Sequence, residues 1–294
     1  MDRPLSARGL RRRACLAGVW GLWTLWGVWG GWVAASAIEP AQRVVSMNPS
    51  LTQTLVALGA LDRLVGVDVY SARSVEAVRG LPQVGGLFSP SLEAVTALSP
   101  DLVVLVPSAA QRDFRGRLRD LEIEVLELPN VTLEELLESI EVLGRRVGEG
   151  PAAEAVVERI QQSWFAARRA SAGLPRPTAV LVLQREPLFV VGGGSFLDSM
   201  LDAVGVENAA ARLGDPYPRV DLEWLIARAP EIILDASPDS DPPASYWSRW
   251  PSLPAVAAGR VRRLPPETVT LPGTDLDRSL QVLFEAVHPQ GLAP

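Results

Sequence analysis

A fourteen-residue pattern occurs twice in this chain, 130 positions apart, as SLEAVTALSPDLVV at residues 91–104 and DLEWLIARAPEIIL at residues 221–234. Each copy begins with a residue that caps helices well, continues with Leu-Glu, and then has a Pro that ends the helix before a short aliphatic strand. Glu93 and Glu223 therefore fall in the first helical turn, where the helix dipole favours a carboxylate. The repeat predicts two α/β lobes of similar plan.

The rest of the chain fits this plan. Residues 50–60 and 196–206 are a second, weaker pair, each an amphipathic helix that ends at a glycine, Gly59 and Gly205. Apolar strands expected at 43–47, 64–67, 102–106 and 123–128 alternate with helices, which predicts mostly parallel sheets covered on both faces. Proteins with two lobes commonly bind small molecules in the cleft between them.

A single long helix is expected over residues 151–172, because Pro151 suits a helix start and Gly173 and Pro175 suit a helix end. The expected division is a leader at 1–37, an N-terminal lobe at 38–150, a bridging helix at 151–173 and a C-terminal lobe at 174–294. A rigid helix between the lobes would resist large hinge motion.

The first 37 residues have the layout of a signal peptide. Arginines between Arg3 and Arg13 precede an apolar run at 14–33, and Ala35-Ser36-Ala37 forms a small-residue cleavage site. We expect cleavage before Ile38 and export to the periplasm. An uncleaved anchor is the alternative, because the apolar run is long enough to span a bilayer. The choice between the general and the twin-arginine export route stays open.

Without the leader, the chain has 28 − 5 = 23 basic and 33 acidic residues (34 − 1), a net charge near −10, with no Lys and no Cys. This composition argues against nucleic-acid binding and excludes thiol chemistry. His288 is the single histidine, so a Ser-His-Asp catalytic set is not expected. The glycines at 192–194 lack the Lys of a phosphate loop and are expected to form a hairpin turn before a helix. We expect no catalytic residues, no metal ligands and no resident cofactor; a secreted enzyme on the two-lobed scaffold is the remote alternative.

Several segments together carry a family resemblance: the leader, RVVSMNPSLTQTLVALGALDRLVGV, the 91–104 element, the bridging helix and PYPRVDLEWLIARAPEIIL. In this order they resemble the helical-backbone class (class III) of periplasmic substrate-binding proteins of ABC importers. The similarity covers essentially the whole chain after the leader. Its most specific part is Pro-Tyr-Pro-x-Val-Asp-x-Glu at 216–223. The class carries cobalamin, haem and ferric siderophores, and this sequence is most similar to its cobalamin-binding members.

The resemblance implies a monomer that captures cobalamin or a related corrinoid between its lobes and delivers it to an ABC permease dimer in the inner membrane. The metal would arrive within the chelate. Haem or a ferric siderophore is the alternative, kept open by Arg73, Arg185 and Arg219 near the expected cleft. The implied ligand-binding residues are Tyr70, Phe88, Phe189, Tyr217 and Glu267, and the implied permease-docking residues are Glu93 and Glu223. Leu271 departs from the class, which has a basic contact there. From the residues alone, the two glutamates would be first-turn acids that favour the helix dipole. Phe88 and Phe189 could equally well be core residues as ligand contacts.

Overall fold

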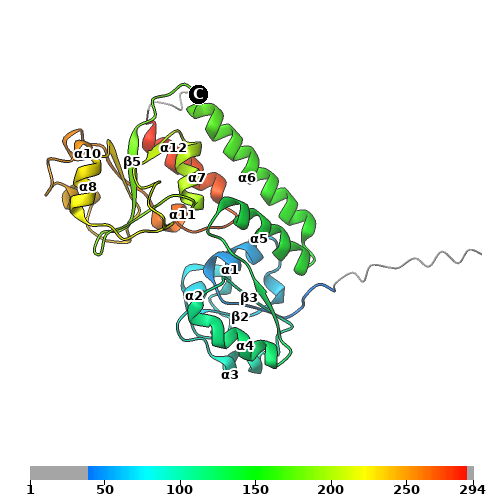
Figure 1. The fold of residues 1–294 in the computed structure, drawn as a ribbon. Helices are drawn as coiled ribbons and strands as arrows, with labels where there is room; N and C mark the ends of the chain where they lie inside the picture. The colour runs from blue at the N-terminus through cyan, green and yellow to red at the C-terminus, as the bar shows by residue number, and fades with distance from the viewer. Residues whose placement is uncertain (1–38, 290–294) are drawn as a thin grey trace, which may run out of the picture. The chain divides into compact units, whose positions relative to one another are not determined.

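The computed structural model describes residues 39–289, which belong to one compact unit built as two α/β lobes (Figure 1). The expected signal peptide at 1–37 lies outside the described residues, so its cleavage stays a prediction. Within the described part of the chain, none of the helices has the length and apolar character needed to cross a membrane.

The first lobe is a parallel sheet of β1 (Val44–Ser46), β2 (Leu64–Val67), β3 (Leu102–Leu105) and β4 (Glu124–Glu127), in the order β2-β1-β3-β4. Its helices are α1 (Pro49–Ala57), α2 (Val69–Ser74), α3 (Leu92–Ala97), α4 (Arg112–Asp120) and α5 (Leu133–Arg146), with single 3-10 turns at Leu61–Arg63, Glu76–Val78 and Ala109–Gln111. Successive residues of β3 enter different core clusters: Leu102 and Val104 pack in one, Val103 and Leu105 in the other. Helices therefore cover both faces of this sheet.

The second lobe is centred on β5 (Thr178–Gln184). Parallel to it lie β7 (Glu207–Asn208) and β8 (Ile232–Asp235), and β9 (Val261–Arg263) extends the sheet beyond β8. Only β6 (Phe189–Val190) runs antiparallel among the described strands. The helices are α7 (Phe196–Ala203), α8 (Leu222–Arg228), α9 (Pro243–Trp247), α10 (Pro254–Ala257), α11 (Pro266–Val269) and α12 (Leu276–Val287). The expected α/β fold with mostly parallel sheets is confirmed.

The two copies of the sequence repeat fold alike. Ser91 Oγ accepts the Ala94 N–H at 3.1 Å, and Asp221 Oδ1 accepts the Trp224 N–H at 2.7 Å, so each copy starts with a side-chain cap. Eight residues into each copy, Ser99 and Ala229 have φ values of 45° and 46°. A residue with left-handed backbone conformation, at the same position in each copy, therefore ends both helices.

The acids that follow the repeated prolines also have the same role. Asp101 accepts the N–H groups of Gln42 and Arg43, just before β1. Glu231 accepts the N–H of Thr178, the first residue of β5, at 2.9 Å. Each acid thus binds the start of the neighbouring strand, which fixes α3 and α8 relative to their sheets.

The bridging helix α6 (Gly150–Ser171) packs against α5 of the first lobe and α7 and α12 of the second (Figure 1). Its buried residues Val157, Ile160 and Trp164 share one core with Leu136 of the first lobe and Leu280 of the second. The helix is therefore both a connector and a core element, which agrees with a nearly fixed angle between the lobes. The lobe limits of the sequence analysis stay predictions.

Candidate ligand-binding site

A cavity of about 350 Å³ lies between the lobes. The first lobe contributes the start of α1 and the loop after β4. The second contributes the end of β5, the first turn of α7, the segment before α8 and the loop after α11. The lining residues are Asn48, Pro49, Ser50, Asn130, Val131, Leu183, Phe196, Leu197, Tyr217, Thr270, Leu271 and Pro272.

The first-lobe wall is polar and forms where strands end. Asn48 follows β1 and caps α1, since its Oδ1 accepts the Ser50 N–H at 2.9 Å. Asn130 follows β4, and its Nδ2 donates to Ser50 Oγ at 3.1 Å. The carboxyl ends of parallel strands are where open α/β sheets bind ligands.

The second-lobe wall is mainly apolar and includes one phenol. Tyr217 lies beside β6, because its two neighbours accept hydrogen bonds from that segment: Val190 N donates to Pro218 O at 3.1 Å and Gly192 N to Pro216 O at 2.8 Å. Burial raises the pKa of Tyr217 to about 12. The side chain is therefore a neutral phenol at physiological pH and can donate a hydrogen bond into the cavity.

Gly192 and Gly193 let the loop before Tyr217 lie close to the backbone that follows β6. A Cβ on Gly192 would lie 2.0 Å from the Asp215 carbonyl oxygen, and one on Gly193 would lie 2.1 Å from that of Ala211. The glycine run follows β6 and leads into α7, whereas the turn between β5 and β6 contains residues 185–188. The expected hairpin turn is thus misplaced, but the glycines do precede a helix and are used for packing.

Arg185, which is buried just after the end of β5, is held by a hydrogen-bonded network that includes the carboxylate of Asp235. The side chains of Arg185 and Asp235 are 2% and 0% exposed, and Arg185 Nε lies 3.0 Å from Asp235 Oδ2. Trp247 Nε1 donates to the same oxygen at 2.7 Å, and the Ser237 hydroxyl donates to Asp235 Oδ1. Arg185 is therefore part of the lobe's internal structure, and the cavity lining contains no charged side chain.

Of the five implied ligand residues, only Tyr217 lines this cavity. Tyr70 on α2 is 51% exposed, and Phe88, in the loop before α3, is 81% exposed. A Cβ on Gly86 would lie 3.2 Å from the Tyr70 ring, so Tyr70 packs against the loop that carries Phe88. Neither of these two exposed aromatics lines the cavity.

The remaining implied residues lie in the second lobe. Phe189, on β6, pairs with Arg219 in an isolated antiparallel bridge and is partly buried. Glu267 is exposed in the first turn of α11, one turn before Thr270, which lines the cavity. Glu93 and Glu223 are exposed in the first turns of α3 and α8, and neither lines the cavity.

Sequence reasoning missed the polar residues Asn48, Ser50, Asn130 and Thr270. The first three had a usable signal, because each closely follows an expected parallel strand at its carboxyl end. Thr270 had none, since its position depends on how the short helix α11 packs.

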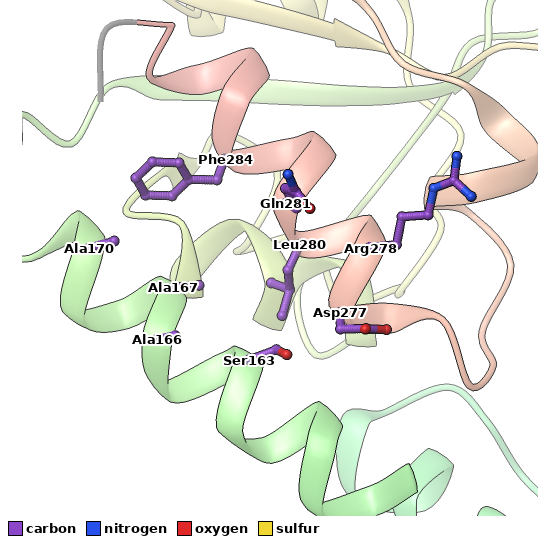
Figure 2. A pocket seen from close by; sticks show the side chains of 9 residues that line it. All are labelled: Ser163, Ala166, Ala167, Ala170, Asp277, Arg278, Leu280, Gln281 and Phe284. Atoms are coloured by element: carbon purple, nitrogen blue, oxygen red, sulfur yellow. The ribbon is translucent and has the colours of Figure 1, made fainter. Parts of the chain in front are cut away.

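A second cavity, of about 390 Å³, lies between α6 and α12 (Figure 2). Figure 2 shows Ala166, Ala167 and Ala170 along α6, and Leu280 and Phe284 on the facing helix α12. It is a groove between two helices, and none of the residues expected to bind ligand lines it.

A family model described as periplasmic binding protein matches residues 44–268, which is most of the chain. The chain belongs to the periplasmic binding protein family. This periplasmic binding protein is 26% identical over 250 residues to the vitamin B12-binding protein of Vibrio parahaemolyticus, covering 85% of this chain and 89% of the relative.

Solved structures of other periplasmic binding proteins share the fold. The periplasmic vitamin B12 binding protein of Vibrio cholerae superposes with a TM-score of 0.74 at 22% identity, over 85% of this chain and 98% of that one. A periplasmic heme binding protein from Pseudomonas aeruginosa has a TM-score of 0.71 at 27% identity, over 85% and 94% of the two chains.

Proposed function

We propose that this periplasmic binding protein captures cobalamin or a related corrinoid in the cavity between its lobes and delivers it to an ABC permease. The names of relatives such as the vitamin B12-binding protein of Vibrio parahaemolyticus support the ligand class. The observation that carries the choice of ligand is the chemistry of the cavity, whose lining is apolar, aromatic, amide or hydroxyl and has no charged side chain.

An uncharged cavity suits a ligand whose edge is uncharged. The corrin ring carries neutral carboxamide side chains, whereas haem carries two propionates and many ferric siderophores are anionic. Burying a carboxylate without a cationic partner costs several kcal/mol, but a carboxamide needs only hydrogen bonds. Leu271 lines the cavity and offers no cation there.

The cavity is smaller than a whole corrinoid, so it would hold one edge of the ring. Tyr217 offers an aromatic face and a phenol donor from the second lobe. The exposed rings of Tyr70 and Phe88 would contact the part of the ligand outside the cavity, since aromatic faces give large apolar contact. Phe189 and Glu267 keep their proposed ligand-binding roles, although neither lines the cavity.

Haem is the second candidate, because the fold is shared with a periplasmic heme binding protein. Tyr217 would be the tyrosine that binds a haem iron in the cavity. The cavity lining offers no cation to pair with the haem propionates, however, and this favours the corrinoid.

Delivery would use the repeated glutamates. Glu93 and Glu223 are exposed and stand at equivalent positions in the two lobes. Two equivalent anions suit a permease dimer with two-fold symmetry, which would offer one arginine pocket per subunit. In this proposal the protein is a periplasmic monomer released from a cleaved leader.

The direct experiment is to mix purified protein with cyanocobalamin, dicyanocobinamide, haemin or a ferric catecholate siderophore and to separate bound from free ligand by gel filtration. The corrinoids should co-elute with the protein in a one-to-one ratio, seen by visible absorbance. Co-elution of haemin or the siderophore without either corrinoid would refute the corrinoid assignment.

A further inference from the structure

The hydrogen bonds around Ser50 fix which way the cavity amides point. The Ser50 N–H is always a donor, so the side-chain atom of Asn48 that faces it must be the carbonyl oxygen, Oδ1. The Ser50 hydroxyl also donates to Asn48 Oδ1, at 2.8 Å. Among residues 39–289 no acceptor bonds to the Asn48 amide nitrogen, so its two N–H donors are available to the cavity that Asn48 lines.

The orientation of Asn130 follows from the same hydroxyl. Because Ser50 Oγ uses its hydrogen on Asn48, it can only accept from Asn130, whose Nδ2 lies 3.1 Å away. The Asn130 carbonyl oxygen then points elsewhere, and within the described chain it accepts no hydrogen bond. One serine therefore sets two amides in opposite senses, with a donor on Asn48 and an acceptor on Asn130.

We infer that Asn48 and Asn130 form a recognition site for one primary carboxamide of the ligand. The carboxamide oxygen accepts from Asn48 Nδ2, and its N–H donates to Asn130 Oδ1. The inference deepens the proposed function and rests on it, because it assigns the amides of a corrinoid edge to particular residues.

This donor and acceptor pair discriminates against a carboxylate of the same shape. A carboxylate has no hydrogen to donate, so one of its oxygens would face the Asn130 carbonyl oxygen without a bond. Leaving buried polar groups unpaired is what makes a hydrogen-bonding site reject a close analogue. The pair thus separates amide-bearing corrinoids from ligands that carry carboxylates at the same place.

The test exchanges Asn48 for Asp, which replaces the donor with a second acceptor and a charge. Asp caps helices as well as Asn does, so Asn48→Asp should keep the cap of α1 and melt within a few degrees of wild type. Its affinity for cyanocobalamin, measured by calorimetric titration, should fall about 10- to 100-fold. Ser91→Asp is the matched control, since it adds one carboxylate at a helix cap of the same lobe outside the cavity, and its affinity should stay within about two-fold of wild type.

A ligand series tests the pair without any substitution. Wild-type protein is titrated with cyanocobalamin and with cyanocobalamin monocarboxylates, each with one peripheral amide hydrolysed. At least one monocarboxylate should bind about 10-fold or more weakly than cyanocobalamin. Equal binding of all monocarboxylates, or an Asn48→Asp affinity equal to that of wild type, would overturn the amide pair and leave the corrinoid assignment standing. Failure of wild-type protein to bind any corrinoid would overturn both.

Discussion

The two lobes share a framework but contribute different chemistry to the cavity. Both use a capped helix, a left-handed residue and an acid bound to the neighbouring strand, at positions 130 apart. The first lobe then offers the polar groups of Asn48, Ser50 and Asn130, whereas the second offers Leu183, Phe196 and Tyr217. Repetition therefore preserves the scaffold and the exposed glutamates, whereas the weaker repeat at 50–60 and 196–206 brings different side chains to the cavity, Ser50 in the first lobe and Phe196 in the second.

The end of the repeat shows where the lobes diverge. Leu105, on β3, and Asp235, on β8, stand 130 positions apart and are both buried. Leu105 packs in an apolar cluster, but Asp235 binds Arg185, Ser237 and Trp247. A polar centre thus replaces apolar packing at the carboxyl end of the second sheet, close to the loops that carry the site.

The largest effect should come from removing this polar centre. Asp235→Ala leaves Arg185 buried without its partner, so the free energy of unfolding should fall by about 3–5 kcal/mol. Asp239→Ala is the control, because the exposed Asp239 carboxylate lies 3.6 Å from Arg185 Nε and should contribute less than about 1 kcal/mol. Urea denaturation measures both. If Asp235→Ala, like Asp239→Ala, lowered the free energy of unfolding by less than about 1 kcal/mol, the second lobe would not depend on its polar centre.

The next effect concerns the close approach that positions Tyr217. Gly192→Ala places a methyl group against the Asp215 carbonyl, so it should cost about 1–3 kcal/mol of stability and weaken cobalamin binding. Gly214→Ala lies in the same loop, where a Cβ meets no atom within 4 Å, and should change neither quantity. Thermal melts and titrations of both variants check this. If a folded Gly192→Ala variant bound cobalamin normally, Tyr217 would not be part of the binding site.

One tyrosine from each lobe can be compared to decide which lobe makes the main aromatic contact with the ligand. Tyr217→Ala should weaken cobalamin binding by about 1–3 kcal/mol, the usual cost of losing a packed aromatic contact. Tyr70→Ala should weaken it by less, because Tyr70 is half exposed and lies outside the cavity. Calorimetric titration gives both values. A larger loss at Tyr70 would move the main ligand contact to the first lobe.

The smallest effect on ligand affinity should come from the repeated glutamates. Glu93→Ala and Glu223→Ala should bind cobalamin like wild type, since neither residue lines the cavity. Each should reduce uptake by whole cells, and the double variant should reduce it further, because each lobe would contact a different permease subunit. Normal uptake by both single variants would return the glutamates to the role of first-turn acids favoured by the helix dipole.

The sequence predicted the framework well because the framework depends on local signals. Strand β2 was predicted at its observed limits, and α6 begins one residue from the expected start. Cap residues, prolines and alternating apolar runs act over a few positions, so they can be read without a structure. The family also followed from the order of such segments.

The candidate site was predicted less completely because it depends on contacts between distant segments. Tyr217 was expected from a family motif, but Asn48 and Asn130 meet only through Ser50, across 80 positions from Ser50 to Asn130. Arg185 was considered a free cation near the cleft, and its pairing with Asp235, 50 positions away, could not be read from local sequence. The family implied that ligand contacts exist, and the fold selects which side chains share a cavity.

A crystal structure of the protein saturated with cyanocobalamin is the strongest test of the proposed site, because it locates the ligand. One edge of the corrin ring should lie in the cavity between the lobes, beside Tyr217, with a peripheral amide between Asn48 and Asn130. Cobalamin bound in the groove between α6 and α12, or a cavity that stays empty in a crystal with bound ligand elsewhere, would contradict the proposed site.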